Sequence, residues 1–156
     1  MSAVRALAIL VLVVAGAACR SAVVPAAGAA NRIEAVLRAQ EAAWNRGDVD
    51  GFMAAGYWHS PELTFLSGGS WTRGYEPVLA RYRARYLGEG REMGRLAFTD
   101  LEIEVLDRDV GLARGRWALT FSEASGAEPL AGLFTLVLRR LPEGWRIVHD
   151  HTSLDS

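Results

Sequence analysis

The sequence predicts an α+β fold in which three N-terminal helices cover one face of an antiparallel sheet. Two observations carry this prediction. Between residues 31 and 87, three segments repeat apolar side chains at helical spacing. Between residues 96 and 152, four segments alternate apolar and polar side chains and are separated by short polar turns, which is typical of an antiparallel meander.

The first 18 residues resemble a signal peptide, with Arg5 followed by an apolar run and small residues up to Ala18. The run is shorter than the roughly 20 residues that a membrane-spanning helix needs. We therefore expect an exported protein, either periplasmic or lipid-anchored to the cell envelope. Cys19 follows Gly16-Ala17-Ala18 as in the lipobox of bacterial lipoproteins, although Gly16 stands where that motif usually has an aliphatic residue. Lipid attachment at Cys19 and ordinary cleavage near Ala18 both stay open.

Composition and charge indicate how the chain is divided and which partners it can bind. Residues 19–30 are rich in small residues and proline and are interpreted as a tether, which leaves residues 31–156 as one domain. The net charge of -1 argues against nucleic acid as a partner, and we expect membrane contact only through a lipid anchor. The single cysteine cannot form an internal disulfide, so the core alone must hold the fold.

The first two helices have clear end signals. Asn31 is the expected N-cap of the first, with Glu34 in capping-box register, and Gly47 is expected to end it. Asp48 is then the expected N-cap of a second helix that runs to about Tyr57. The two helices should form a tight pair.

A short hairpin precedes the third helix. Residues 63–66 and 70–73 can pair across the turn Gly68-Gly69, and residues 75–87 carry an apolar helical face. The expected strands of the sheet are 96–106, 110–122, 129–141 and 144–152.

The register of these strands predicts charge pairs on the outer face of the sheet. If each hairpin closes symmetrically about its turn, Glu102 lies opposite Arg114 and Asp100 lies opposite Arg116. Continuing this register turns Asp150 to the same outer face. A β-bulge would exchange the two faces locally.

His149 and His151 are the foremost candidates for a functional role. Alternation places them with Trp145 and Ile147 on the apolar face, beneath the helices. Histidine changes charge near neutral pH, so either can act as a general acid or base. The alternative is that both are half-buried side chains that support the sheet. We expect no metal, because zinc takes three or four protein ligands and His59 is the only other histidine.

Other side chains are candidates for lining a cavity. Tyr57 is the expected partner of His149 in acid/base chemistry. Aromatic or polar residues expected to contact a ligand are Trp58, Ser67, Trp71, Tyr82, Trp117 and Phe134. Core packing is the alternative for each aromatic residue. No cofactor is expected.

Several motifs together carry a family resemblance. They are Trp44-Asn45-Arg46-Gly47-Asp48, Tyr57-Trp58, Phe65-Leu66-Ser67-Gly68-Gly69, Arg73-Gly74 and the terminal Gly-Trp-Arg-Ile-Val-His-Asp-His-Thr-Ser. With them, residues 31–153 resemble the nuclear transport factor 2-like superfamily, and within it the SnoaL-like and ketosteroid-isomerase-like bacterial domains. The resemblance implies a cone-shaped, curved antiparallel sheet with the three helices on its concave face. It also implies a small-molecule pocket and a homodimer formed through the sheet.

The resemblance leaves two functions open. The chain is either an exported domain that binds a small hydrophobic or aromatic molecule, with or without acid/base chemistry, or a dimerisation module with a vestigial pocket. The terminal strand is also similar to the association domain of calcium/calmodulin-dependent kinases, which assembles oligomers. A ketosteroid-isomerase-like enzyme would need a carboxylate base at the end of the first strand, where this chain has Ser67 or Leu66.

Overall fold

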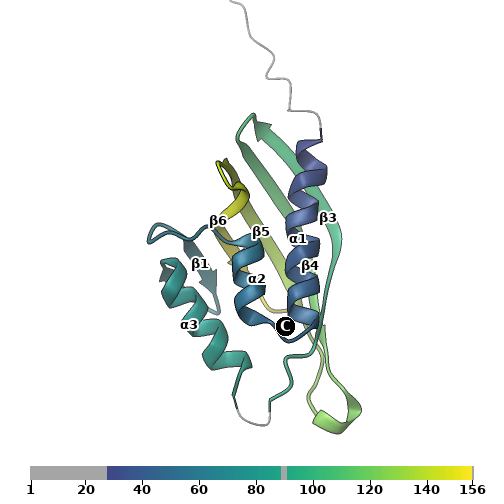
Figure 1. Ribbon diagram of the computed structural model, residues 1–156. Helices are drawn as coiled ribbons and strands as arrows, with labels where there is room; N and C mark the ends of the chain where they lie inside the picture. The colour runs from purple at the N-terminus through teal and green to yellow at the C-terminus, as the bar shows by residue number, and fades with distance from the viewer. Residues whose placement is uncertain (1–27, 89–90, 156) are drawn as a thin grey trace, which may run out of the picture.

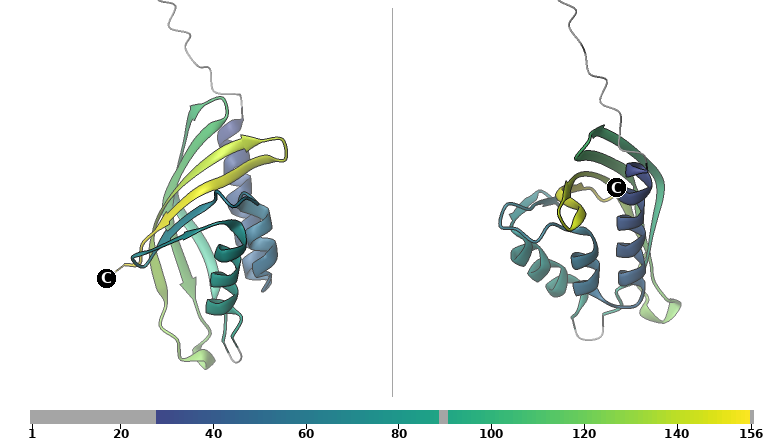
Figure 2. Two further views of the ribbon diagram at one scale, coloured as in Figure 1. Left: turned by 90° about the vertical axis from the view of Figure 1, so that its left-hand side faces the viewer. Right: turned by 45° about the horizontal axis from the view of Figure 1, so that its top comes forward.

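The computed structural model describes residues 28–88 and 91–155, in which three helices pack on one face of a six-stranded curved sheet (Figures 1 and 2). This arrangement confirms the predicted fold class. The expected signal peptide, most of the expected tether and Cys19 lie outside the described residues. Within the described part, no helix has the length and apolar character needed to cross a membrane.

The helices are α1 (Ala29–Asn45), α2 (Val49–Gly56) and α3 (Tyr75–Tyr86). Helix α1 begins after Gly28, so the prediction that Asn31 caps it was wrong, and Asn31 lies in the first turn. Gly47 does follow the helix, with the positive φ of 80° that favours glycine. Asp48 is the N-cap of α2 as predicted, because its Oδ1 accepts a hydrogen bond of 2.6 Å from Gly51 N–H.

The motif at the junction of α1 and α2 attaches the helices to the edge of the sheet. Asn45 exchanges two hydrogen bonds with the backbone of Leu96, at 2.9 and 2.7 Å. The indole Nε1 of Trp44 donates to the carbonyl of Gly94 at 3.0 Å. The side chains of this motif therefore fix where the concave side of the sheet meets the helices.

The strands are β1 (Thr64–Ser67), β2 (Ser70–Arg73), β3 (Arg95–Asp107), β4 (Val110–Thr120), β5 (Leu130–Leu141) and β6 (Gly144–Thr152). Their order in the sheet is β2-β1-β6-β5-β4-β3. Strand β1 runs parallel to β6, so the sheet is mixed and not antiparallel throughout as predicted. The last strand of the meander thus lies beside a strand from the other end of the domain, a pairing that alternation patterns do not reveal.

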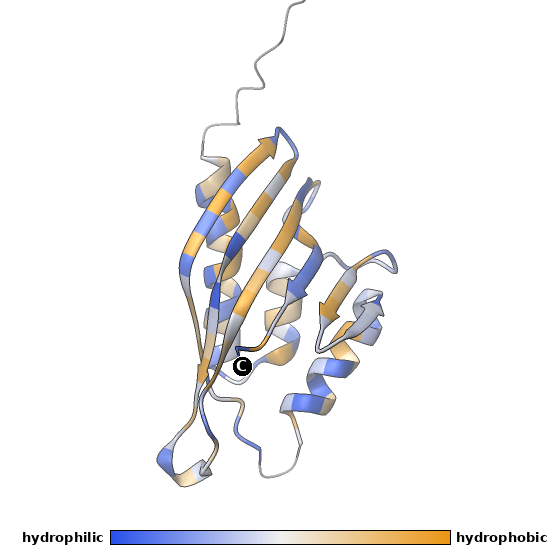
Figure 3. Cartoon of the chain, turned by 180° about the vertical axis from the view of Figure 1, so that it is seen from behind, coloured by the Kyte–Doolittle hydropathy of each residue, from blue (hydrophilic) through white to orange (hydrophobic). Residues whose placement is uncertain are grey.

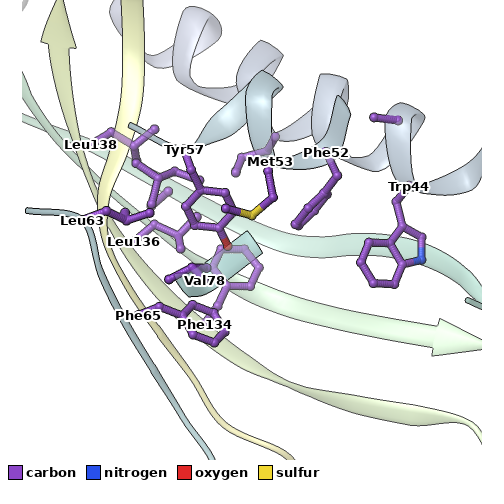
Figure 4. Packing of buried hydrophobic residues seen from close by; sticks show 14 of the residues in the cluster. Trp44, Phe52, Met53, Tyr57, Leu63, Phe65, Val78, Phe134, Leu136 and Leu138 are labelled. Carbon is purple, nitrogen blue, oxygen red and sulfur yellow. The ribbon is translucent and has the colours of Figure 1, made fainter. Parts of the chain in front are cut away.

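The core lies between the helices and the concave face of the sheet. Figure 4 shows Trp44, Phe52 and Met53 on the helical side facing Phe134 and Leu136 of β5. All five are at most 6% exposed. Burial of apolar side chains, at about 25 cal/mol per Å², is the main force that holds this cluster together.

The outer face follows the predicted register only in part. Glu102 pairs with Arg114 as predicted, and their side chains approach to 3.6 Å. The predicted pairing of Asp100 with Arg116 was wrong, because the register shifts between Thr99 and Glu102 and Asp100 adopts a φ of 51°. Arg116 instead pairs with Asp155.

A β-bulge in β6 decides which side chains face the core. Ile147 pairs with Leu138 of β5, whereas His149 pairs with the preceding Val137, so Val148 is an extra residue. From this point the alternation is reversed. The prediction that His149 and His151 lie under the helices was therefore wrong, and so was the placement of Asp150 on the outer face. Asp150 is 5% exposed and points inward.

The C-terminal segment closes over one end of the sheet. Ser153 and Asp155 donate backbone hydrogen bonds to Leu133 and Ala131 of β5, at 2.9 and 2.8 Å. The chain passes so close to Gly132 that a Cβ there would lie 1.8 Å from the carbonyl oxygen of Ser153. Glycine at this position lets residues 153–155 complete one wall of the interior.

Candidate functional site

A cavity of about 220 Å³ lies between the three helices and the concave face of the sheet. Its walls are largely aromatic, with Trp44 and Phe52 from the first two helices and Phe65, Trp117 and Phe134 from the strands. An apolar cavity on the order of 150 Å³ is large enough to bind benzene. This cavity therefore has room for a small ring compound.

Asp150 is the polar centre of the cavity. Its Oδ2 accepts a hydrogen bond of 2.6 Å from the hydroxyl of Tyr57, whose oxygen lies 3.3 Å from the hydroxyl oxygen of Tyr82. Among the described residues, Oδ1 of Asp150 has no hydrogen-bond partner although it is buried. A buried acceptor without a partner is costly, and such groups are rare unless they serve a function or meet a ligand.

The cavity changes the acidity of all three groups. Burial raises the pKa of Asp150 from 3.8 to about 7, and the hydrogen bond from Tyr57 lowers it only in part. Burial, followed by the negative charge of Asp150, raises the pKa of Tyr57 and of Tyr82 well above the usual range. Near neutral pH, Asp150 can therefore release and regain a proton while both tyrosines keep theirs.

Backbone geometry brings these residues together from distant parts of the chain. Tyr57 directly follows α2 and forms a parallel bridge with Ile147, and the next backbone N–H, of Trp58, donates to the carbonyl of Ile147 at 3.0 Å. The bulge at Val148 then turns Asp150 inward toward Tyr57. Without this extra residue, the carboxyl group would lie on the opposite face of the sheet.

The structure brings together five of the predicted site residues. The predicted residues that line the cavity are Tyr57, Ser67, Tyr82, Trp117 and Phe134. Trp58 and Trp71 do not line it, and Trp71 is 66% exposed on the hairpin. Trp71 pairs with Leu66, whose side chain points to the outer face, and this register explains its exposure.

The two histidines lie on the outer face of the sheet. His149 is half-buried, and its Nδ1 is 2.7 Å from Oγ1 of Thr64. Burial, together with the neighbouring His151, lowers the pKa of His149. His151 is exposed. Within residues 28–88 and 91–155, no group of three or more His, Cys, Asp or Glu side chains is placed to hold a metal ion.

Sequence reasoning missed three charged residues of the cavity. They are Asp150, which was assigned to the outer face, and Arg81 and Arg85 of α3, which were not among the predicted site residues. The arginines are four residues apart, as are Tyr82 and Tyr86, so the four side chains share one side of the helix. This spacing was the signal that could have placed them.

The raised pKa of Asp150 predicts an unusual dependence of stability on pH. Because the folded protein holds this proton more tightly than the unfolded chain, the stabilisation is complete below pH 3.8 and is lost as the pH rises through about 7. Relative to Asp150→Asn, the free energy of unfolding of the native protein should fall by about 4 kcal/mol between pH 4 and pH 8. Urea denaturation at a series of pH values measures this difference.

Asp50→Asn is the matched control, because Asp50 is exposed and its hydrogen bond with Arg83 lowers the pKa of its carboxyl group. This variant should retain the fall in stability between pH 4 and pH 8. Parallel pH profiles for the native protein and Asp150→Asn would contradict the assignment of a neutral, buried acid.

Comparisons with known proteins agree with this architecture. An NTF-2 like protein of unknown function from Shewanella oneidensis MR-1 is 35% identical, with a TM-score of 0.71 over 79% of this chain and 97% of that chain. A putative calcium/calmodulin-dependent protein kinase type II association domain from Thiobacillus denitrificans is 26% identical, with a TM-score of 0.64 over 79% and 94%. A ketosteroid isomerase-like protein from Erwinia carotovora atroseptica is 23% identical, with a TM-score of 0.63 over 81% and 96%.

The comparison with curated proteins finds no match. The family model of the SnoaL-like domain matches residues 33–155 of the 156 in the chain. The chain therefore belongs to the SnoaL-like domain family.

Proposed function

We propose that this domain binds a small, largely apolar molecule in its cavity and exchanges a proton with it through Asp150. The observation that carries the proposal is the buried Oδ1 of Asp150, which has no hydrogen-bond partner among the described residues. The aromatic walls supply apolar contact, and this one oxygen is left for a polar atom of the ligand.

The polar groups suit a general base. Tyr57 holds Oδ2 and orients the carboxyl group, so that the lone pairs of Oδ1 are available for an acidic proton of the ligand. A pKa of about 7 lets the same carboxyl group accept a proton and later return it. The simplest substrate for this chemistry is a compound with an acidic C–H group next to a carbonyl group, as in isomerase- or cyclase-like reactions.

Likeness in fold to a ketosteroid isomerase-like protein is compatible with this chemistry but does not carry the proposal, because one fold serves many functions. The expected base differs from the one suggested by the sequence. His149 lies on the outer face, so the proposal assigns the proton transfer to Asp150 and the orienting hydrogen bond to Tyr57.

Hydrogen exchange into 2-tetralone, a two-ring ketone with acidic α-protons, tests this proposal. The protein in D₂O should accelerate the loss of the α-proton signal in ¹H NMR, with a rate that rises with pH and levels off above about 7. Asp150→Asn should lower the catalysed rate about 100-fold, because general base catalysis is typically worth 10²–10⁴-fold. Tyr57→Phe should shift the midpoint to higher pH, because the hydrogen bond from Tyr57 lowers the pKa of Asp150.

His149→Ala is the matched control and should keep the native exchange rate. Equal rates for Asp150→Asn and the native protein would rule out Asp150 as the base. Loss of exchange in His149→Ala alone would instead return the role to the histidine.

We also propose that a second copy of the chain covers the outer face of the sheet. Figure 3 views the molecule from the side of this face. By the alternation of the strands, the face carries Trp71 of β2, which is 66% exposed, and Leu133 of β5, which is 49% exposed. Exposed apolar side chains are typical of interaction sites where they belong to a contiguous patch. The observation favours the second candidate function, a dimerisation module, and is compatible with a working cavity.

Replacing Leu133 by Arg should convert a dimer to a monomer, because the interface would have to bury a charge without a partner. Sedimentation velocity measures the oligomeric state. Leu87→Arg, at an equally exposed leucine beyond the end of α3, should leave the dimer intact. A native protein that sediments as a monomer would contradict the proposal.

Export and attachment of a lipid at Cys19 stay predictions from the sequence. The signal-peptide pattern and the lipobox-like Gly16-Ala17-Ala18-Cys19 support them. Either a periplasmic or a membrane-anchored domain would carry the same cavity.

A further inference from the structure

We propose that the ligand of this cavity is a carboxylic acid whose carboxylate is bound by Arg81 and Arg85, while its other end meets Asp150. The inference rests on the proposed function, since it assumes that the cavity holds a ligand. It adds the chemical class: a small ring compound with an anionic group at the end remote from Asp150.

Both arginines belong to the wall of the cavity. They are four residues apart on α3 and line the same space as Tyr82, Tyr86 and Asp150. The rest of the wall near them consists of Ser67 and Gly68 of the hairpin and Ser153 and Leu154 of the C-terminal segment, which are uncharged. Two guanidinium groups thus line the wall beside these four uncharged residues, and Asp155 of the same segment pairs with Arg116.

Arg81 is held in place by neutral partners. Its Nη1 donates to Oγ1 of Thr72 at 3.1 Å and its Nη2 donates to the carbonyl of Ser67 at 2.9 Å. The guanidinium carbon lies 5.2 Å from the centre of the Phe65 ring. A guanidinium group has five N–H donors, so this side chain is oriented and still has donors for an anion.

Arg85 is more exposed, and its guanidinium carbon lies 5.5 Å from the centre of the Tyr86 ring. In the part of the chain that the structure describes, neither Arg81 nor Arg85 has a carboxylate within 4.0 Å. Arg83, between them in sequence, donates to Asp50 at 2.9 Å outside the cavity. On this helix, the arginine outside the cavity has an acidic partner and the two that line it have none.

The charges of the cavity favour an anion. Its charged lining residues are Arg81, Arg85 and Asp150, and Asp150 is neutral for part of the time near pH 7. The positive charge of Arg81 also acts on the hydroxyl of Tyr82, where it lowers the pKa against the larger effect of burial. Paired N–H donors of arginine match a carboxylate in geometry as well as charge.

These contacts describe a ligand with two different ends. A carboxylate meets the arginines of α3, a ring fills the aromatic middle, and a carbonyl or an acidic C–H group meets Oδ1 of Asp150. The buried Oδ1 without a hydrogen-bond partner among the described residues fixes the inner end, and the two arginines without a carboxylate partner there fix the outer one.

Isothermal titration calorimetry with two matched compounds tests the inference. The compounds are 2-tetralone 6-carboxylate and 2-tetralone 6-carboxamide, which have the same rings and ketone but differ in charge. The native protein should bind the carboxylate at least about 10-fold more tightly, because hydrogen bonds to charged groups are roughly twice as strong as neutral ones. Arg85→Gln should bring the ratio of the two affinities close to one, and Arg81→Gln should reduce it as well.

Arg139→Gln is the control, since Arg139 is exposed on β5 and does not line the cavity. It removes the same charge and should leave the ratio unchanged. Equal affinities for the two compounds in the native protein would overturn the carboxylate inference and leave the cavity as a binding site. A ratio that Arg85→Gln and Arg81→Gln do not change would also overturn it. Failure of both compounds to bind would overturn this inference together with the proposed function.

Discussion

The hydrogen bond between Tyr57 and Asp150 is the contact around which the interior of this domain is organised. It joins the end of α2 to the last strand, and it can form only because the extra residue Val148 reverses the alternation of β6. The same strand carries His149 on its other face, against Thr64 of β1. One bulge therefore decides which of three consecutive titratable side chains meets the cavity and which two meet the outer surface.

This arrangement sets stability against function. A buried carboxyl group with one oxygen unpaired is a cost that the surrounding aromatic cluster must offset, and an apolar residue of similar size would pack there without it. Retention of the acid next to the buried Tyr57 and the partly buried Tyr82 is understandable if the cavity receives a ligand. Arg81 and Arg85 of α3, which have no carboxylate partner among the described residues, extend the same reasoning to the other end of the cavity.

The fold could be predicted from the sequence, but most of the charged residues of the site could not. Helical and strand periodicities, the Asp48 cap and the terminal motif predicted three helices and the four-stranded meander, because these signals are local. The parallel pairing of β1 with β6 and the bulge at Val148 are not local: no glycine or proline marks the bulge within the strand. Strict alternation consequently assigned Asp150 and the histidines to the wrong faces. The prediction that Tyr57, Tyr82 and Phe134 line a cavity did not depend on the register of one strand, because aromatic residues from several elements cluster there.

The titration of the Asp150 carboxyl group shows whether this residue is a proton-carrying acid at the cavity. ¹³C NMR of the aspartate carboxyl carbons, with Asp150→Asn used to assign the signal, follows the protonation of this group. We expect a midpoint near pH 7, far above the ordinary value of 3.8. A midpoint close to 4 would mean that Asp150 is a solvated carboxylate, and it would contradict both the buried geometry and the proposed chemistry.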